Sequence, residues 1–139
     1  MLRMSHLPSD FHPLLLVLGD HTDLARFAEM LAAFARTGRP IQVGGEGGAF
    51  STDTDVLLEP ADGAPGRPRG LWRDPAKPGA LRWTLSRDEA GAFALEVAEL
   101  ANSNAPVGSV TLECGILNEI RVKVSVGEWE DEFLTDGVR

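Results

Sequence analysis

Two stretches of the sequence decide the fold: DHTDLARFAEMLAAFARTGRP at residues 20–40 and SRDEAGAFALEVAELANSNAP at residues 86–106. Each opens on a residue that can cap a helix, Asp20 or Ser86, and carries an acidic residue three positions later, which is the capping-box pattern. Apolar residues then recur at i, i+3, i+4 and i+7, the spacing of one helical face. A proline ends each stretch, where it stops a helix from continuing. Both stretches therefore predict amphipathic helices.

The two stretches coincide when the chain is shifted on itself by 66 residues, and so do the apolar segments on either side of them. We therefore predict a repeat of two β-α-β-β units, over about 13–59 and 80–126, within a single domain that spans 1–139. The region 60–79 is rich in proline and glycine and is predicted to be a connection. The helix residues expected in the core are Phe27, Leu31, Phe34, Phe93, Val97 and Leu100.

Strands are predicted on both sides of each helix. In the first unit the helix is expected at 22–37 and the strands at 13–19, 40–44 and 53–59. In the second unit the helix is expected at 87–102 and the strands at 80–85, 108–114 and 119–126. A short extra strand at 70–73 is expected to pair with 81–84. Period-2 alternation in the later strands favours an α+β fold, a mainly antiparallel sheet with two helices packed on one face.

The composition limits the functional class. Thirteen Lys and Arg residues against 21 Asp and Glu residues give a net charge of −8, which argues against nucleic acid as a partner. A single cysteine, Cys114, excludes an internal disulfide and a multi-cysteine zinc site. The longest apolar run, Leu14 to Leu18, is far shorter than a membrane span and lacks the features of a signal peptide. We expect a cytoplasmic protein with no membrane partner.

Patterns that would indicate catalysis or metal binding are weak. The three histidines, His6, His12 and His21, all lie early in the chain and share no helical i, i+4 spacing, so we expect no metal site. Cys114 falls at an inward strand position and is expected to be a small buried apolar residue. The glycine run at 44–48 has no phosphate-loop spacing and no following helix. We expect no catalytic residue, no cofactor and no enzymatic activity.

Two segments are candidates for partner binding. One is the group Arg69, Trp72 and Arg73 in the connection, because Arg and Trp are typical of interface hot spots. It could equally be a solubilising loop whose Trp72 packs on the sheet edge. The other segment combines four carboxylates and two aromatic rings, which suits docking on a basic surface; its residues are Glu128, Trp129, Glu130, Asp131, Glu132 and Phe133. It could also be a solvated segment held to the core by its aromatic residues.

Three motifs carry a resemblance to a known family: LSRDEA at 85–90, EIRVKVS at 119–125 and GEWEDEF at 127–133. Together they resemble small α+β immunity proteins of bacterial polymorphic toxin systems. The resemblance covers about residues 84–136, with Trp129 where the family pattern leads us to expect tyrosine. It implies a non-enzymatic inhibitor that binds a cognate toxin, and it assigns no catalytic residue.

Three hypotheses follow from the sequence. The first is a protein-binding module, an immunity protein that neutralises a basic toxin through its acidic and aromatic surface. The second is a small-ligand or enzymatic domain with a pocket between helices and sheet that uses His21, Cys114 or Arg82. The third is a homodimeric structural module whose exposed sheet face is its interface, so both monomer and homodimer remain open.

Overall fold

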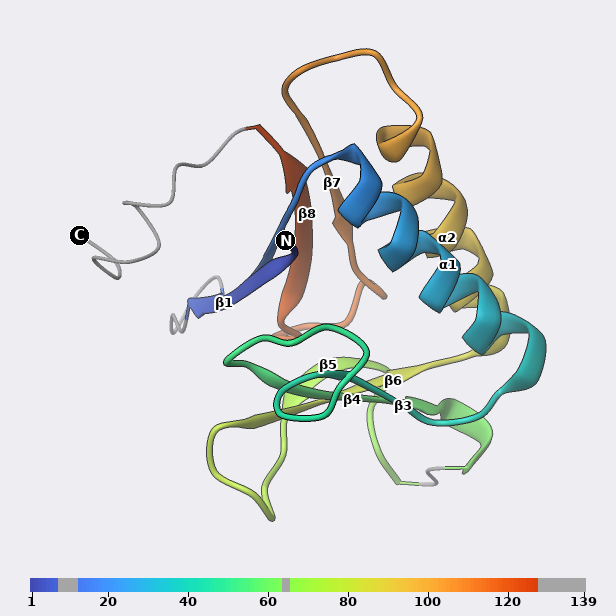
Figure 1. Cartoon of the computed structure of the whole chain (residues 1–139). Coiled ribbons are helices and arrows are strands. Elements are labelled where there is room, and N and C mark those ends of the chain that lie inside the picture. Colours follow the sequence, from blue (N-terminus) through green and yellow to red (C-terminus); the bar gives the residue numbers. More distant parts are fainter. Residues whose placement is uncertain (8–12, 64–65, 128–139) are drawn as a thin grey trace.

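The computed structural model of the chain describes residues 1–7, 13–63 and 66–127 (Figure 1). The elements of the first half are β1 (Arg3–Leu7), β2 (Leu14–Leu18), α1 (His21–Thr37), β3 (Ile41–Gly44) and β4 (Asp55–Pro60). A 3₁₀ turn at Ala61–Gly63 follows β4. The elements of the second half are β5 (Gly70–Arg73), β6 (Ala80–Leu85), α2 (Arg87–Ala101), β7 (Gly108–Leu112) and β8 (Arg121–Val126). The described part of the chain thus reads strand, strand, helix, strand, strand, twice.

The two halves keep the spacing expected from the sequence. The elements β2, α1 and β4 begin at residues 14, 21 and 55, and β6, α2 and β8 begin at 80, 87 and 121, which is 66 residues later in each case. The predicted pairing of 70–73 with 81–84 is confirmed, with Trp72 opposite Arg82. One strand was not expected: β1 pairs along its whole length with β2. Its five residues contain too little alternation to predict a strand.

Strand pairing joins the two halves. One sheet, sheet A, has the order β1-β2-β8-β7, and the other, sheet B, has the order β3-β4-β6-β5. Each sheet combines one hairpin from each half, and the central pairs, β2 with β8 and β4 with β6, are parallel. The α+β class is therefore confirmed, but the expectation of one mainly antiparallel sheet is corrected to two mixed sheets. The reason is that each helix carries the chain from one sheet to the other.

Both predicted capping boxes form. The side chain of Asp20 accepts a hydrogen bond from the Asp23 N–H at 2.8 Å, and the Asp23 carboxylate accepts one from the Asp20 N–H at 3.0 Å. Ser86 and Glu89 make the same exchange at the start of α2, at 3.0 and 2.9 Å. Gly38 ends α1 with a φ of 67°, a left-handed conformation that glycine adopts without strain. Local sequence thus sets where both helices start and where α1 stops.

The core lies where both sheets turn a face toward the two helices, which run side by side (Figure 1). The ring of Trp83 on β6 stacks between Phe27 of α1 and Phe93 of α2, with ring centroids 6.3 Å apart on each side. The predicted core residues are all confirmed as buried: Phe27, Leu31, Phe34, Phe93, Val97 and Leu100. Among the described residues, no helix is long and apolar enough to cross a membrane.

Candidate functional site

The three candidate residues of the connection lie around strand β5. Leu71 and Trp83 point into the core, so their neighbours Trp72 and Arg82 lie on the opposite, outer face of sheet B. The indole N–H of Trp72 donates a hydrogen bond to the Arg69 carbonyl at 2.9 Å. The guanidinium of Arg69 pairs with Glu89 at 2.9 Å, which ties the connection to the start of α2. Trp72 is therefore held in place on the outer face and is half-buried.

A pocket of about 530 Å³ opens beside Trp72. We call it the Trp72 pocket; its charged and aromatic lining consists of Arg67, Trp72, Arg73 and Arg82. Two prolines of the connection, Pro68 and Pro75, stand at its margin. An aromatic wall with several guanidinium groups suits a partner that offers a carboxylate next to an apolar group.

The arginines of the Trp72 pocket differ in how they are paired. Arg82 lies 2.9 Å from Glu59 and 3.0 Å from Asp74, and Arg67 lies 3.6 Å from Glu59. Arg73 is exposed and, among the described residues, has no carboxylate within ion-pair distance. Arg73 is thus the cation of the pocket that an acidic partner could reach without breaking an existing pair.

The charges beneath the pocket are firmly ionised. The pKa of Asp74 is lowered because its carboxylate accepts the Ala76 N–H and a hydrogen bond from Arg82. The pKa of Arg82 is raised in turn, chiefly by its hydrogen bond to Asp74. Glu59 is nearly fully buried and also accepts a hydrogen bond from the Thr84 hydroxyl at 3.2 Å. These contacts hold the Arg82 guanidinium between Asp74 and Glu59.

The second candidate segment cannot be placed in the same way. Its residues Glu128, Trp129, Glu130, Asp131, Glu132 and Phe133 lie outside the described residues. His12 does as well. The sequence-based prediction that this acidic and aromatic segment contacts a partner therefore stays a prediction.

The residues of the enzymatic hypothesis occupy different surroundings. Burial raises the pKa of the Cys114 thiol to about 12, with a further contribution from its hydrogen bond to Glu89, so the nucleophilic thiolate is scarce at neutral pH. His21, the first residue of α1, places its Nε2 atom 3.1 Å from the Ala105 carbonyl oxygen. Arg82 lies on the outer face of sheet B. The Trp72 pocket and the pockets around His6, Pro13 and Met1 contain no helix residue.

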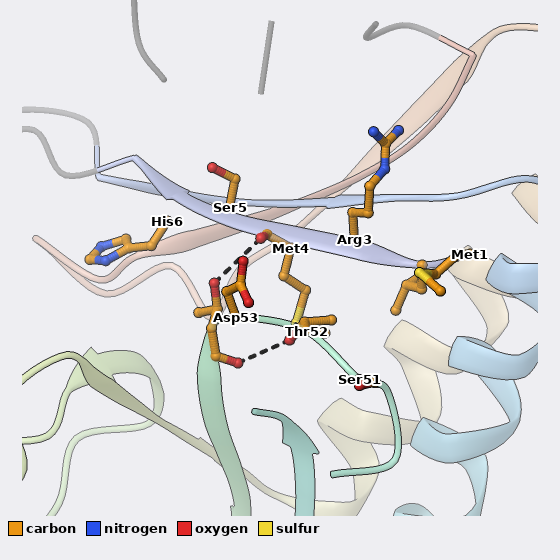
Figure 2. Close-up of a pocket in the computed structure, with 10 residues that line it drawn as sticks. Met1, Arg3, Met4, Ser5, His6, Ser51, Thr52 and Asp53 are labelled. Carbon is orange, nitrogen blue, oxygen red and sulfur yellow. Dashed lines mark hydrogen bonds between the residues drawn. The ribbon is translucent and has the colours of Figure 1, made fainter. Parts of the chain in front are cut away.

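The largest of these pockets, about 660 Å³, lies between β1 and the loop 51–54 (Figure 2). The loop reaches the strand through the Thr54 hydroxyl, which donates to the Met4 carbonyl at 3.4 Å. The equivalent junction in the second half is closed by a backbone hydrogen bond from Ile120 N–H to Leu71 O at 2.9 Å. The pocket is thus the looser of two related sheet junctions, and its lining is too polar to resemble an enclosed ligand cavity.

His6 stands at one end of this pocket (Figure 2). His6 belongs to β1, and its ring nitrogen Nε2 is buried and has no hydrogen-bond partner among the described residues. Burial lowers the pKa of His6, and the nearby Arg73 guanidinium lowers it further, so the ring is neutral at pH 7. This environment combines β1 with residues distant in the sequence, Arg73 among them, so no local pattern around His6 could have predicted it.

Within the described ranges, no group of three or more His, Cys, Asp or Glu residues is placed to hold a metal ion. Comparisons with protein-family models, with curated proteins and with solved structures gave no match.

Proposed function

We propose that this chain is a non-enzymatic protein-binding module that contacts its partner through the Trp72 pocket. One observation carries the proposal: an exposed Arg73 and a fixed Trp72 line the same pocket beside β5. Arg and Trp are the residue types that most often dominate binding energy, particularly when a rim of other groups excludes water around them. Here Arg67, Arg82 and the two prolines line the pocket together with Trp72 and Arg73.

The resemblance to immunity proteins makes a bacterial toxin the first partner class to test. In that proposal the chain neutralises a toxin by covering its surface, and the acidic segment Glu128–Phe133 steers the approach of a basic toxin. The Trp72 pocket would supply the anchor. An acidic, negatively charged inhibitor approaches a basic enzyme faster at low salt, because the attraction is screened as salt rises.

The test begins with capture of the partner by the tagged full chain from its native cells, followed by mass spectrometry. The identified partner is then produced alone and titrated against the wild type, Trp72→Ala and Arg73→Gln. Loss of Trp72 should weaken binding by about 2 kcal/mol, roughly thirtyfold, because it removes the buried anchor. Arg39→Gln removes an exposed arginine outside the pocket and is the matched control.

A toxin partner adds a second readout. Expression of the captured partner alone should arrest growth, and co-expression of the wild-type chain, but not of Trp72→Ala, should restore it. If Trp72→Ala binds the partner as tightly as the wild type, the pocket is not the contact surface. If the partner is harmless when expressed alone, the immunity role is wrong even where binding holds.

A further inference from the structure

Each sheet ends in an edge strand that belongs to the last hairpin of one half, β3 in sheet B and β7 in sheet A. The edge of β3 is covered by the segment that follows this strand, because residues 49–50 fold back along it. The Ala49 N–H donates to the Gln42 carbonyl at 2.8 Å, and the Phe50 N–H donates to the Val43 carbonyl at 2.9 Å. The ring of Phe50 is buried and lies 5.8 Å from Phe27 of α1. The edge of β3 is thus occupied by backbone donors and an aromatic anchor.

The related strand β7 is not covered in this way. In the part of the chain that the structure describes, Gly108–Leu112 are hydrogen-bonded to β8 and to nothing else. The strand is uncharged, and its outward residues Ser109 and Thr111 are exposed. Natural sheets protect an open edge with lysine, proline, a bulge or a covering segment. Among the residues that the structure describes, the edge of β7 has none of these, so its outward N–H and C=O groups can accept another strand.

The helix above this edge is acidic on the side that overhangs it. Gly108 faces α2, since a side-chain carbon built there would come within 2.9 Å of Leu100. Glu96 lies one helical turn before Leu100 on the same side of α2, and Glu99 lies one turn after Glu96, farther from the sheet. Both glutamates are exposed, and neither has a basic group within ion-pair distance among the described residues. Side chains of a strand added to β7 would therefore meet negative charge from the helix.

We propose that the open edge of β7 is a docking site for an extended, basic segment of a protein partner, which adds to sheet A as a further strand. Backbone hydrogen bonds to β7 supply affinity, and lysine or arginine side chains facing Glu96 and Glu99 supply specificity. The alternate, apolar side chains of the added strand then lie on the opposite face of sheet A, beside the exposed Ser109 and Thr111. A second copy of this chain does not fit, because it would bring the glutamates of two molecules of charge −8 together.

The proposal rests on the proposed function only in taking a protein as the partner, and its test needs no natural partner. The probe is the synthetic peptide Lys-Val-Lys-Phe-Lys-Val-Lys with blocked ends, and the comparison peptide carries Glu in place of every Lys. Binding to the full chain is measured by nuclear magnetic resonance titration and by amide hydrogen exchange. The basic peptide should slow exchange of outward-facing β7 amides by about tenfold or more and leave β3 unchanged.

Charge reversal tests the role of the helix. Glu96→Lys combined with Glu99→Lys should weaken binding of the basic peptide by about tenfold at low salt. The matched control combines Glu29→Lys with Glu46→Lys, which makes the same charge change at exposed sites on α1 and in the β3–β4 loop. Thr111→Lys, an edge lysine of the protective kind, should also weaken binding, and thermal melting checks that every variant is folded.

Three results would overturn the proposal: equal binding of the acidic peptide, protection of another edge instead of β7, or unchanged affinity in the Glu96/Glu99 variant. Failure here is separable from failure of the proposed function. If the peptide does not bind but the captured partner still depends on Trp72, only the edge proposal falls. If the peptide binds at β7 while Trp72→Ala leaves partner binding intact, only the pocket proposal falls.

Discussion

Truncation of Phe93 to alanine tests the packing of α2 against sheet B. Phe93 is 8% exposed on α2 and stacks on Trp83 of β6 at 6.3 Å, with an angle of 23° between the rings. Removing a buried phenyl ring costs about 3–5 kcal/mol, and lost ring stacking is part of that figure. For a chain of 139 residues this corresponds to a fall in melting temperature of about 10–15 °C.

Urea unfolding followed by circular dichroism measures the free-energy change, and a scan of temperature measures the melting point. Leu95→Ala is the matched control, because Leu95 lies on the same helix but is 69% exposed. It should change the free energy of unfolding by less than about 0.5 kcal/mol. A Phe93→Ala variant that loses less than about 1 kcal/mol would refute the reasoning, since the ring would then not be part of a packed core.

Three further predictions follow from local contacts. Ser86→Ala should lower the free energy of unfolding by about 1 kcal/mol in urea titrations, because it removes the oxygen that accepts the Glu89 N–H. Cys114 in the folded chain should react with iodoacetamide far more slowly than a free thiol at pH 8, as measured by mass spectrometry, because its pKa is about 12. His6 has a folded-state pKa below the unfolded value of 6.5, so its contribution to stability is complete above pH 6.5 and is lost as the pH falls toward the folded pKa. His6→Asn should therefore lose less stability than the wild type between pH 7 and pH 5 in urea unfolding; an equal loss would contradict this.

The elements with local signals were predictable from the sequence. The helices begin at their capping boxes, Asp20 and Ser86, and the six core residues could be named because helical spacing repeats every three or four positions. The hairpin of β5 and β6 also followed from local sequence. In each case the residues that interact are close together along the chain.

What could not be predicted depends on contacts between distant residues. Leu14 pairs with Arg121 in the parallel ladder of β2 and β8, although no local pattern relates these two positions. For this reason the sequence led us to expect one sheet where the structure has two. The same holds for the candidate sites. Trp72 and Arg73 could be singled out by residue type, but Glu59 and the full pairing of Arg82 depend on the register of β4 and β6. The open edge of β7 is visible only when the strand order is known.

Because each sheet combines one hairpin from each half, the two sheets can form at different times during synthesis. All four strands of sheet B lie between Ile41 and Leu85, so they can pair as soon as that length has left the ribosome. Sheet A needs β8, whose last residue is Val126, and until then one side of β2 has no partner. At about 5–20 residues per second, the apolar strand Leu14–Leu18 waits for several seconds after its own emergence. Until β8 is made, the hairpin of β1 and β2 therefore leaves the β8 side of Leu14–Leu18 open to other chains.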